Sequence, residues 1–244
     1  MSKLGLMMHR TAITHNRQPL IQPLIDFGAR RIVTHVVLAA LCAGGVYATR
    51  LLYVPYGEFR YVMTIGAGYV SLILLVATLS VGTVFMLRRR RNPVNSYIRR
   101  DMGIWAAIMG ILHVIFGLQI RYGGDILLYF FRYTENGTYR PRLNLVGVSN
   151  YIGLIATIIL LILLATSNDY MLRTLKGKRW KSLQRFNYLL VALALIHTFA
   201  YQRASRREEF FTSATLLLTV FLMGVLMLGV ILFRSRMRIR RRFR

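Results

Sequence analysis

The chain has 244 residues, of which 55% are hydrophobic, and a formal net charge of +25. Only 17% of the residues are charged, against roughly 25% in a typical soluble domain, and the apolar residues fall into blocks of about 20, the length that crosses a hydrocarbon core. These features exclude an ordinary soluble domain and indicate one integral membrane bundle.

Six apolar blocks are long enough to span a bilayer, and they lie at residues 32–52, 62–87, 102–120, 145–166, 184–202 and 211–233. We therefore expect an all-α integral membrane protein with a bundle of six transmembrane helices. The expected organisation is an N-terminal cytoplasmic or interfacial segment at 1–31, the bundle at 32–233 and a basic cytoplasmic tail at 234–244.

The basic residues are distributed asymmetrically between the two sides of this bundle. Of the 33 Lys and Arg residues, 24 lie in the N-terminal segment, the segments after the second and fourth spans, and the C-terminal tail. Basic residues favour the cytoplasmic side, so both termini are predicted to be cytoplasmic. The runs RRRR at 88–91 and RSRMRIRRRFR at 234–244 are then anchors at anionic lipid headgroups, and no nucleic-acid partner is expected.

The longest segment on the opposite, outer side is 121–144, which contains the stretch ILLYFFRY. This stretch is too short to span the membrane and too apolar to be freely solvated. We expect it to form an amphipathic piece at the outer interface.

Three of the five histidines, His35, His113 and His197, lie within predicted spans. His113 lies about 18 Å along the third span and His197 about 21 Å along the fifth, at 1.5 Å per residue. Both spans run outward, so the two imidazoles are predicted at similar depth in the outer half of the membrane. Two such histidines can clamp a heme iron from both sides. Alternatively, each makes a structural hydrogen bond to a neighbouring helix.

Two stretches carry a family resemblance. RRDMGIWAAIMGILH at 99–113 resembles the entry to the third helix of the ferric reductase-like transmembrane domain, in which a basic pair and a glycine precede a histidine. A later pattern in that family also matches, at Gly153, Thr166-Ser167, Trp180, Leu183, Arg185, Tyr188 and His197. The resemblance covers roughly residues 62–233 and extends to small bacterial members, such as the heme-binding membrane subunits of periplasmic methionine sulfoxide reductase systems.

The resemblance implies a b-type cytochrome with one heme held by His113 and His197. A second heme is not expected, because Gln184 stands where the family has a histidine nearer the inner face, and Arg100 stands thirteen residues before His113. For His35 we expect a structural hydrogen bond rather than heme ligation.

Four residues of the outer segment could hold the heme propionates, since Arg pairs well with carboxylates: Arg121, Tyr122, Arg140 and Arg142. Solubility of the loop explains these residues equally well. The single cysteine, Cys42, excludes an intrachain disulfide and a cysteine metal cluster.

The leading functional hypothesis is a membrane electron-transfer subunit of an oxidoreductase in the bacterial inner membrane. No flavin or pyridine-nucleotide domain is recognisable, so a quinol or a separate redox protein would supply electrons, and an acceptor on the outer side would take them. The alternative is a heme-free family member that serves as a structural subunit of a larger membrane complex.

Overall fold

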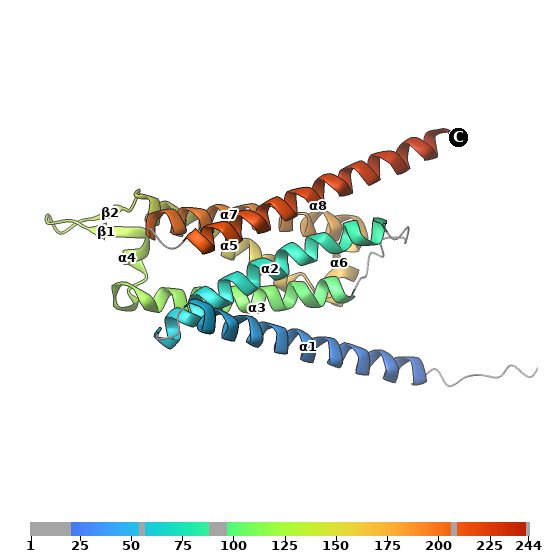
Figure 1. Cartoon of the computed structure of the whole chain (residues 1–244), viewed down its shortest axis with the longest axis horizontal. Coiled ribbons are helices and arrows are strands. Elements are labelled where there is room, and N and C mark those ends of the chain that lie inside the picture. Colours follow the sequence, from blue (N-terminus) through green and yellow to red (C-terminus); the bar gives the residue numbers. More distant parts are fainter. Residues whose placement is uncertain (1–20, 54–56, 88–96, 206–208, 243–244) are drawn as a thin grey trace, which may run out of the picture.

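Long helices make up most of the protein. The computed structural model describes residues 21–53, 57–87, 97–205 and 209–242, arranged as shown in Figure 1. The long helices are α1 (Ile21–Tyr53), α2 (Phe59–Leu87), α3 (Tyr97–Ile120), α5 (Leu145–Ala165), α6 (Asp169–Gln184), α7 (Phe186–Ser205) and α8 (Glu209–Arg242). The short elements are the 3₁₀ helix η1 (Tyr122–Gly124), the helix α4 (Leu127–Phe130) and the strands β1 (Phe131–Tyr133) and β2 (Tyr139–Pro141).

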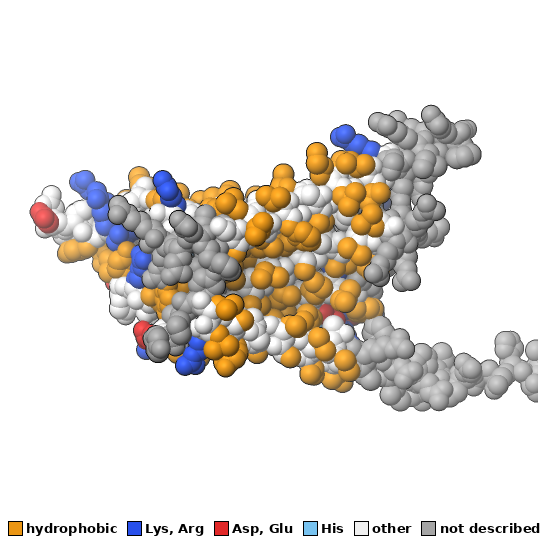
Figure 2. All heavy atoms as spheres, in the orientation of Figure 1, with side chains coloured by type: hydrophobic (Ala, Val, Ile, Leu, Met, Phe, Trp, Pro, Cys, Tyr) orange, Lys and Arg blue, Asp and Glu red, His pale blue; other side chains and the backbone are white. Residues whose placement is uncertain are grey.

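Six segments in the described part of the chain are long and apolar enough to cross a membrane. Their bounds are Arg31–Leu52, Phe59–Phe85, Tyr97–Ile120, Leu145–Ala165, Lys178–Ala204 and Ser213–Leu232. The expected all-α bundle of six spans is confirmed. Large apolar side chains cover the middle of the visible face and Lys and Arg lie at its ends, as Figure 2 shows, which is the surface that a bilayer requires.

Helix α2 lies at the centre of the bundle. Its span is 56% buried, whereas the other five spans are 11% to 22% buried. Two antiparallel pairs, α2 with α3 and α5 with α7, face each other. Helix α1 packs on α2 and α3, and α8 packs on α2 and α7. The start of α1 and the end of α8 lie at the same end of the bundle (Figure 1).

An apolar core joins the two pairs in the half of the bundle nearer the start of α1 and the end of α8, which is called the inner half after the predicted topology. Branched side chains from α2, α5 and α7 interdigitate there with small residues of α3, and α8 adds one leucine. The buried members are Leu72, Leu75, Val76, Leu79, Ala106, Ala107, Ala156, Leu160, Leu163, Leu190, Val191, Leu195 and Leu222. Such packing excludes water and sets the spacing of the helices.

The outer segment differs from the expected amphipathic piece. It consists of the 3₁₀ turn η1, the single α-helical turn Leu127–Phe130 and a two-stranded antiparallel hairpin. Tyr129 is 4% exposed and points into the protein. Its hydroxyl donates to the Gly117 carbonyl and accepts from the Arg121 amide, each at 2.9 Å. This polar anchor ties the short helix to the end of α3, which hydropathy alone does not reveal.

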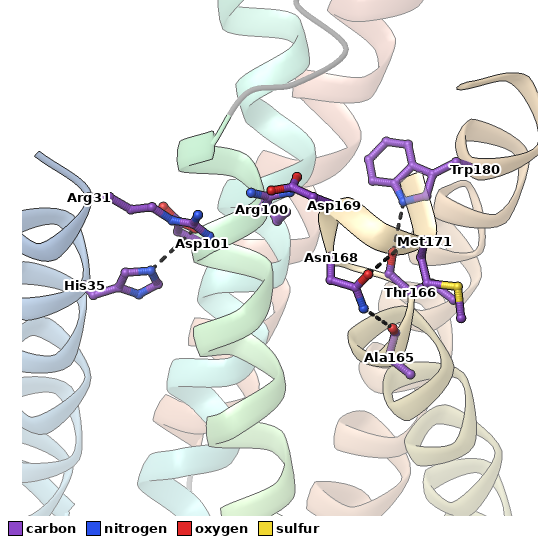
Figure 3. A network of polar contacts seen from close by, with 10 residues as sticks. All are labelled: Arg31, His35, Arg100, Asp101, Ala165, Thr166, Asn168, Asp169, Met171 and Trp180. Carbon is purple, nitrogen blue, oxygen red and sulfur yellow. Dashed lines mark hydrogen bonds and ion pairs between the residues drawn. The ribbon is translucent and has the colours of Figure 1, made fainter. Parts of the chain in front are cut away.

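The inner end of the bundle carries a polar network (Figure 3). Asp101 on α3 is 1% exposed, and its carboxylate lies 3.4 Å from the Arg31 guanidinium and 3.6 Å from Nε2 of His35, both on α1. Trp105 donates from Nε1 to Nδ1 of His35 at 3.1 Å. His35 therefore makes the structural hydrogen bond that we expected of it. A buried carboxylate needs such partners.

A second ion pair in Figure 3 connects α3 to the start of α6. Arg100 Nη1 donates to the Asp169 carboxylate at 2.5 Å. This hydrogen bond holds the pKa of Asp169 below its ordinary value. A carboxyl group with a lowered folded-state pKa stabilises the fold above its unfolded pKa, and that stabilisation is lost as the pH falls through the folded pKa.

Asp169→Asn should therefore lower the melting temperature slightly at pH 7 and should have a smaller effect at pH 3, which lies below the ordinary pKa of an Asp side chain. Because the Asp169 side chain is 53% exposed, solvent screening limits its contribution to less than about 1 kcal/mol. Thermal unfolding of detergent-purified protein at both pH values measures the difference. Glu135→Gln, an exposed carboxylate in the outer hairpin, is the control. Equal effects of Asp169→Asn at both pH values would contradict the assignment.

Candidate functional site

A cavity of about 420 Å³ lies between the α2/α3 pair and the α5/α7 pair, toward the outer end. Its floor is the top of the apolar core, at Leu72, Leu75, Leu160 and Leu190. Its roof is the outer segment, at Ile126, Tyr129 and Phe130. Small residues widen it between the helices: Gly68, Gly110, Gly117, Gly153, Ala156 and Ala194.

Two histidines line this cavity from opposite pairs, His113 on α3 and His197 on α7. Their ring centroids lie 6.1 Å apart, and the ring planes are inclined by 86°. The structure thus brings together the two residues that depth matching put at the same level.

Each imidazole is held by a backbone carbonyl of the neighbouring helix. Nδ1 of His113 donates to the Thr64 carbonyl at 2.7 Å, and Nδ1 of His197 donates to the Ser149 carbonyl at 2.8 Å. Because a carbonyl oxygen only accepts, each Nδ1 must carry the proton. Nε2 of each ring is then left with its lone pair, the form in which histidine binds a metal.

Each imidazole also rests against a glycine. A Cβ at Gly68 would lie 2.7 Å from Nδ1 of His113, and a Cβ at Gly153 would lie 2.8 Å from Nδ1 of His197. No side chain fits in either place without moving the ring. The glycine in the matched sequence pattern at 153 therefore has a physical role, which is to admit the imidazole of α7.

The arrangement fits a metal group that brings most of its own ligands. Within the described ranges, no three His, Cys, Asp or Glu side chains gather as a metal site, so two imidazoles are the available donors in the cavity. The 6.1 Å between ring centroids leaves room for one metal bonded to each ring at about 2 Å. A porphyrin supplies the remaining ligands, and iron accepts imidazole readily.

The four candidate propionate residues are separated by the structure. Arg121 lines the cavity, with its guanidinium 5.6 Å from the ring centroid of Tyr201. Arg142 lies over the Tyr122 ring at 4.9 Å, and neither of these two residues lines the cavity. Arg140 lies exposed on β2, away from the cavity wall.

Sequence reasoning missed four polar residues that line the outer part of the cavity: Tyr69, Asn150, Tyr201 and Gln202. Asn150 donates to the Tyr129 carbonyl at 2.9 Å and so fixes the roof. Gln202 donates to the Tyr69 hydroxyl and to Thr215, which closes the gap beneath α8. Single polar residues in or near the ends of transmembrane spans are common, and the sequence alone does not separate those that line a cavity from those that face lipid headgroups. No sequence pattern therefore identifies these four.

The inner level of the bundle, at which a second heme ligand was considered, is not part of the cavity. Gln184 and Arg100 do not line the cavity. Arg100 is engaged by Asp169, and Nε2 of Gln184 is buried without a hydrogen-bond partner in the described part of the chain. The apolar core occupies the bundle between this level and the cavity.

Comparison with known proteins gives the family. The model of the ferric reductase like transmembrane component matches residues 65–195. This region contains most of α2, all of α3 and α5, His113 and Ser149, and it ends just before His197. The chain belongs to this family.

Several bacterial proteins named protein-methionine-sulfoxide reductase heme-binding subunit are similar to this chain. The protein of Pectobacterium carotovorum is 32% identical over 155 residues, which are 63% of this chain and 71% of that protein. The protein of Klebsiella pneumoniae is 35% identical over 130 residues, 53% of this chain and 59% of that protein. The protein of Pasteurella multocida is 26% identical over 168 residues, 69% of this chain and 73% of that protein.

Gly153→Ala should destabilise the protein by about 1–3 kcal/mol, because the new methyl overlaps His197 and an overpacked site must shift. Gly103→Ala on α3 is the matched control, since a Cβ there meets no atom within 4 Å and alanine is the better helix former. Thermal unfolding of both purified variants measures the difference. Equal stability of the two variants would show that His197 does not rest against Gly153.

Proposed function

We propose that the chain is a b-type heme-binding electron-transfer subunit of a membrane oxidoreductase system. The observation that carries the proposal is the pair His113 and His197, whose rings meet across one cavity with Nδ1 of each bonded to a backbone carbonyl. The similarity to proteins named as heme-binding subunits supports the same cofactor. Bound heme would supply reversible one-electron redox chemistry at its iron.

The chain's own residues position and shield that cofactor. The carbonyls of Thr64 and Ser149 fix the two imidazoles in the tautomer that offers Nε2. The apolar floor and the roof bound the cavity toward the two ends of the bundle. Arg121 is the candidate partner for a propionate, because it is the arginine that lines the cavity.

A single heme is the stoichiometry that the inner half supports. An axial ligand for heme iron is missing at Gln184, and the space between that level and the cavity is occupied by the apolar core. The other position considered for a second heme ligand is occupied by Arg100, whose guanidinium forms an ion pair with Asp169.

The proposed donor and acceptor are chosen to suit the depth of the cavity in the predicted topology. With cytoplasmic termini, as the basic residues indicate, the cavity lies in the outer half of the bacterial inner membrane. The subunit would receive electrons from a quinol or a redox protein and pass them to an acceptor on the outer side. A single heme in the outer half is poorly placed to carry electrons across the whole membrane, so a donor site at mid-depth or a role confined to the outer half fits this proposal best.

The pyridine hemochrome assay on carefully prepared, detergent-purified protein tests the cofactor directly. We expect about one b heme per chain, because two imidazole ligands define one axial pair. His113→Ala and His197→Ala should each lose most of the heme, whereas His35→Ala, which removes a structural histidine, should retain it.

Other outcomes point elsewhere. Heme-free wild-type protein that co-purifies at fixed stoichiometry with a large complex would replace this proposal with a structural-subunit role. Two hemes per chain would show that the inner half binds a cofactor in spite of Gln184.

A further inference from the structure

The β1–β2 hairpin presents two arginines directly opposite each other. Arg132 on β1 is the register partner of Arg140 on β2, and both side chains are exposed. The ion pairs found in the described part of the chain include neither. Like charges directly opposite in a two-stranded ribbon oppose its formation, so the pair calls for an anionic partner from outside the chain.

The opposite face of the ribbon is aromatic. Tyr133 and Tyr139 are the next register pair, their ring centroids lie 5.2 Å apart, and they are 62% and 52% exposed. Paired arginines beside exposed tyrosines are the residue types that protein interfaces favour. Successive residues of a strand point to opposite faces, so the ribbon offers one charged and one aromatic face.

The β1–β2 hairpin follows directly after the segment that forms the roof of the cavity. Phe130 lines the cavity, and β1 begins at the next residue. The Phe130 carbonyl accepts from the Tyr151 hydroxyl at 2.6 Å and from the Arg142 amide at 2.7 Å, which fixes the base of the ribbon to α5 and closes it. A molecule that binds the ribbon is therefore held above the cavity.

We propose that this hairpin is the docking arm for the outer electron acceptor, and that the acceptor is a soluble protein with an acidic surface. The inference rests on the proposed function, which requires an acceptor on the outer side. A protein is favoured over lipid headgroups because the ribbon projects beyond the helix ends, along the length of the bundle (Figure 1). Lys and Arg side chains lie on this end in Figure 2 together with a few acidic ones, and the acidic Glu135 belongs to the hairpin turn. Such a charge pattern steers an oppositely charged partner and sets its orientation.

A local reporter of binding tests the proposal with the full chain in phosphatidylcholine nanodiscs. Asn136→Cys in the hairpin turn carries an environment-sensitive dye, and labelling is selective because Cys42 is buried. A peptide of ten glutamates is the probe for an acidic surface. We expect binding that weakens with salt, and a loss of about tenfold in affinity when Arg132→Glu and Arg140→Glu are combined.

The matched control is Arg173→Glu combined with Lys178→Glu on α6, an equal change of charge at exposed positions on the inner side. This control should leave the response of the dye unchanged. An unchanged affinity in the hairpin variant, or an equal loss in the control, would overturn the proposal. Loss of peptide binding when the discs contain phosphatidylglycerol would overturn it in favour of a lipid-binding ribbon.

Binding at the dye does not depend on heme, so the hemochrome assay on the same samples reports separately on the proposed function. A further measurement links docking at the hairpin to electron transfer. Heme-loaded protein is reduced with dithionite and is then oxidised by the anion tris(oxalato)cobaltate(III). One electron passes from ferrous iron to cobalt(III), giving ferric iron and cobalt(II). The hairpin charge reversal should slow this step severalfold and should accelerate oxidation by the cation hexaammineruthenium(III).

Discussion

The structure depends on two imidazoles that are fixed by backbone carbonyls from neighbouring helices. His113 is bonded to α2 through Thr64, and His197 is bonded to α5 through Ser149. Each bond joins the two members of one helix pair, so the histidines are part of the packing within α2/α3 and α5/α7. A buried imidazole without a partner would be costly. The same bonds therefore satisfy one ring nitrogen and leave the other for a ligand.

The two halves of the bundle differ in the size of the residues between the helices. Gly68 and Gly153 let the helices receive the imidazoles at the outer level. Below them, Val76 and Val191 are almost fully buried between the same helices. The helices thus enclose a cavity above and a solid core below, although the spans have similar composition. The asymmetry leaves space for a flat cofactor at one level of the bundle, the level of His113 and His197.

Much of this was predictable from the sequence. Six apolar blocks gave the six spans, because bilayer thickness sets helix length, and equal depth on parallel spans paired His113 with His197. The outer segment was not predictable in the same way. The Tyr129 hydroxyl bonds to Gly117 and Arg121, and Asn150 donates to the Tyr129 carbonyl, and these contacts build the roof. Such contacts depend on the three-dimensional approach of segments, which neither hydropathy nor periodicity encodes.

The two ends of the bundle differ in how the charged residues named here are paired. At the inner end the buried acid Asp101 lies beside Arg31 and His35, and Asp169 engages Arg100. These charges are neutralised within the chain and connect α1, α3 and α6. At the outer end Arg60 lies 3.6 Å from Glu58, but Arg132 and Arg140 face each other and belong to none of the ion pairs in the described residues. Charges that are paired internally stabilise a fold, whereas exposed like charges contribute mainly to steering and recognition. The inner network therefore connects helices within the chain, whereas the exposed arginines of the hairpin are available to a molecule outside it, which is the basis of the docking proposal.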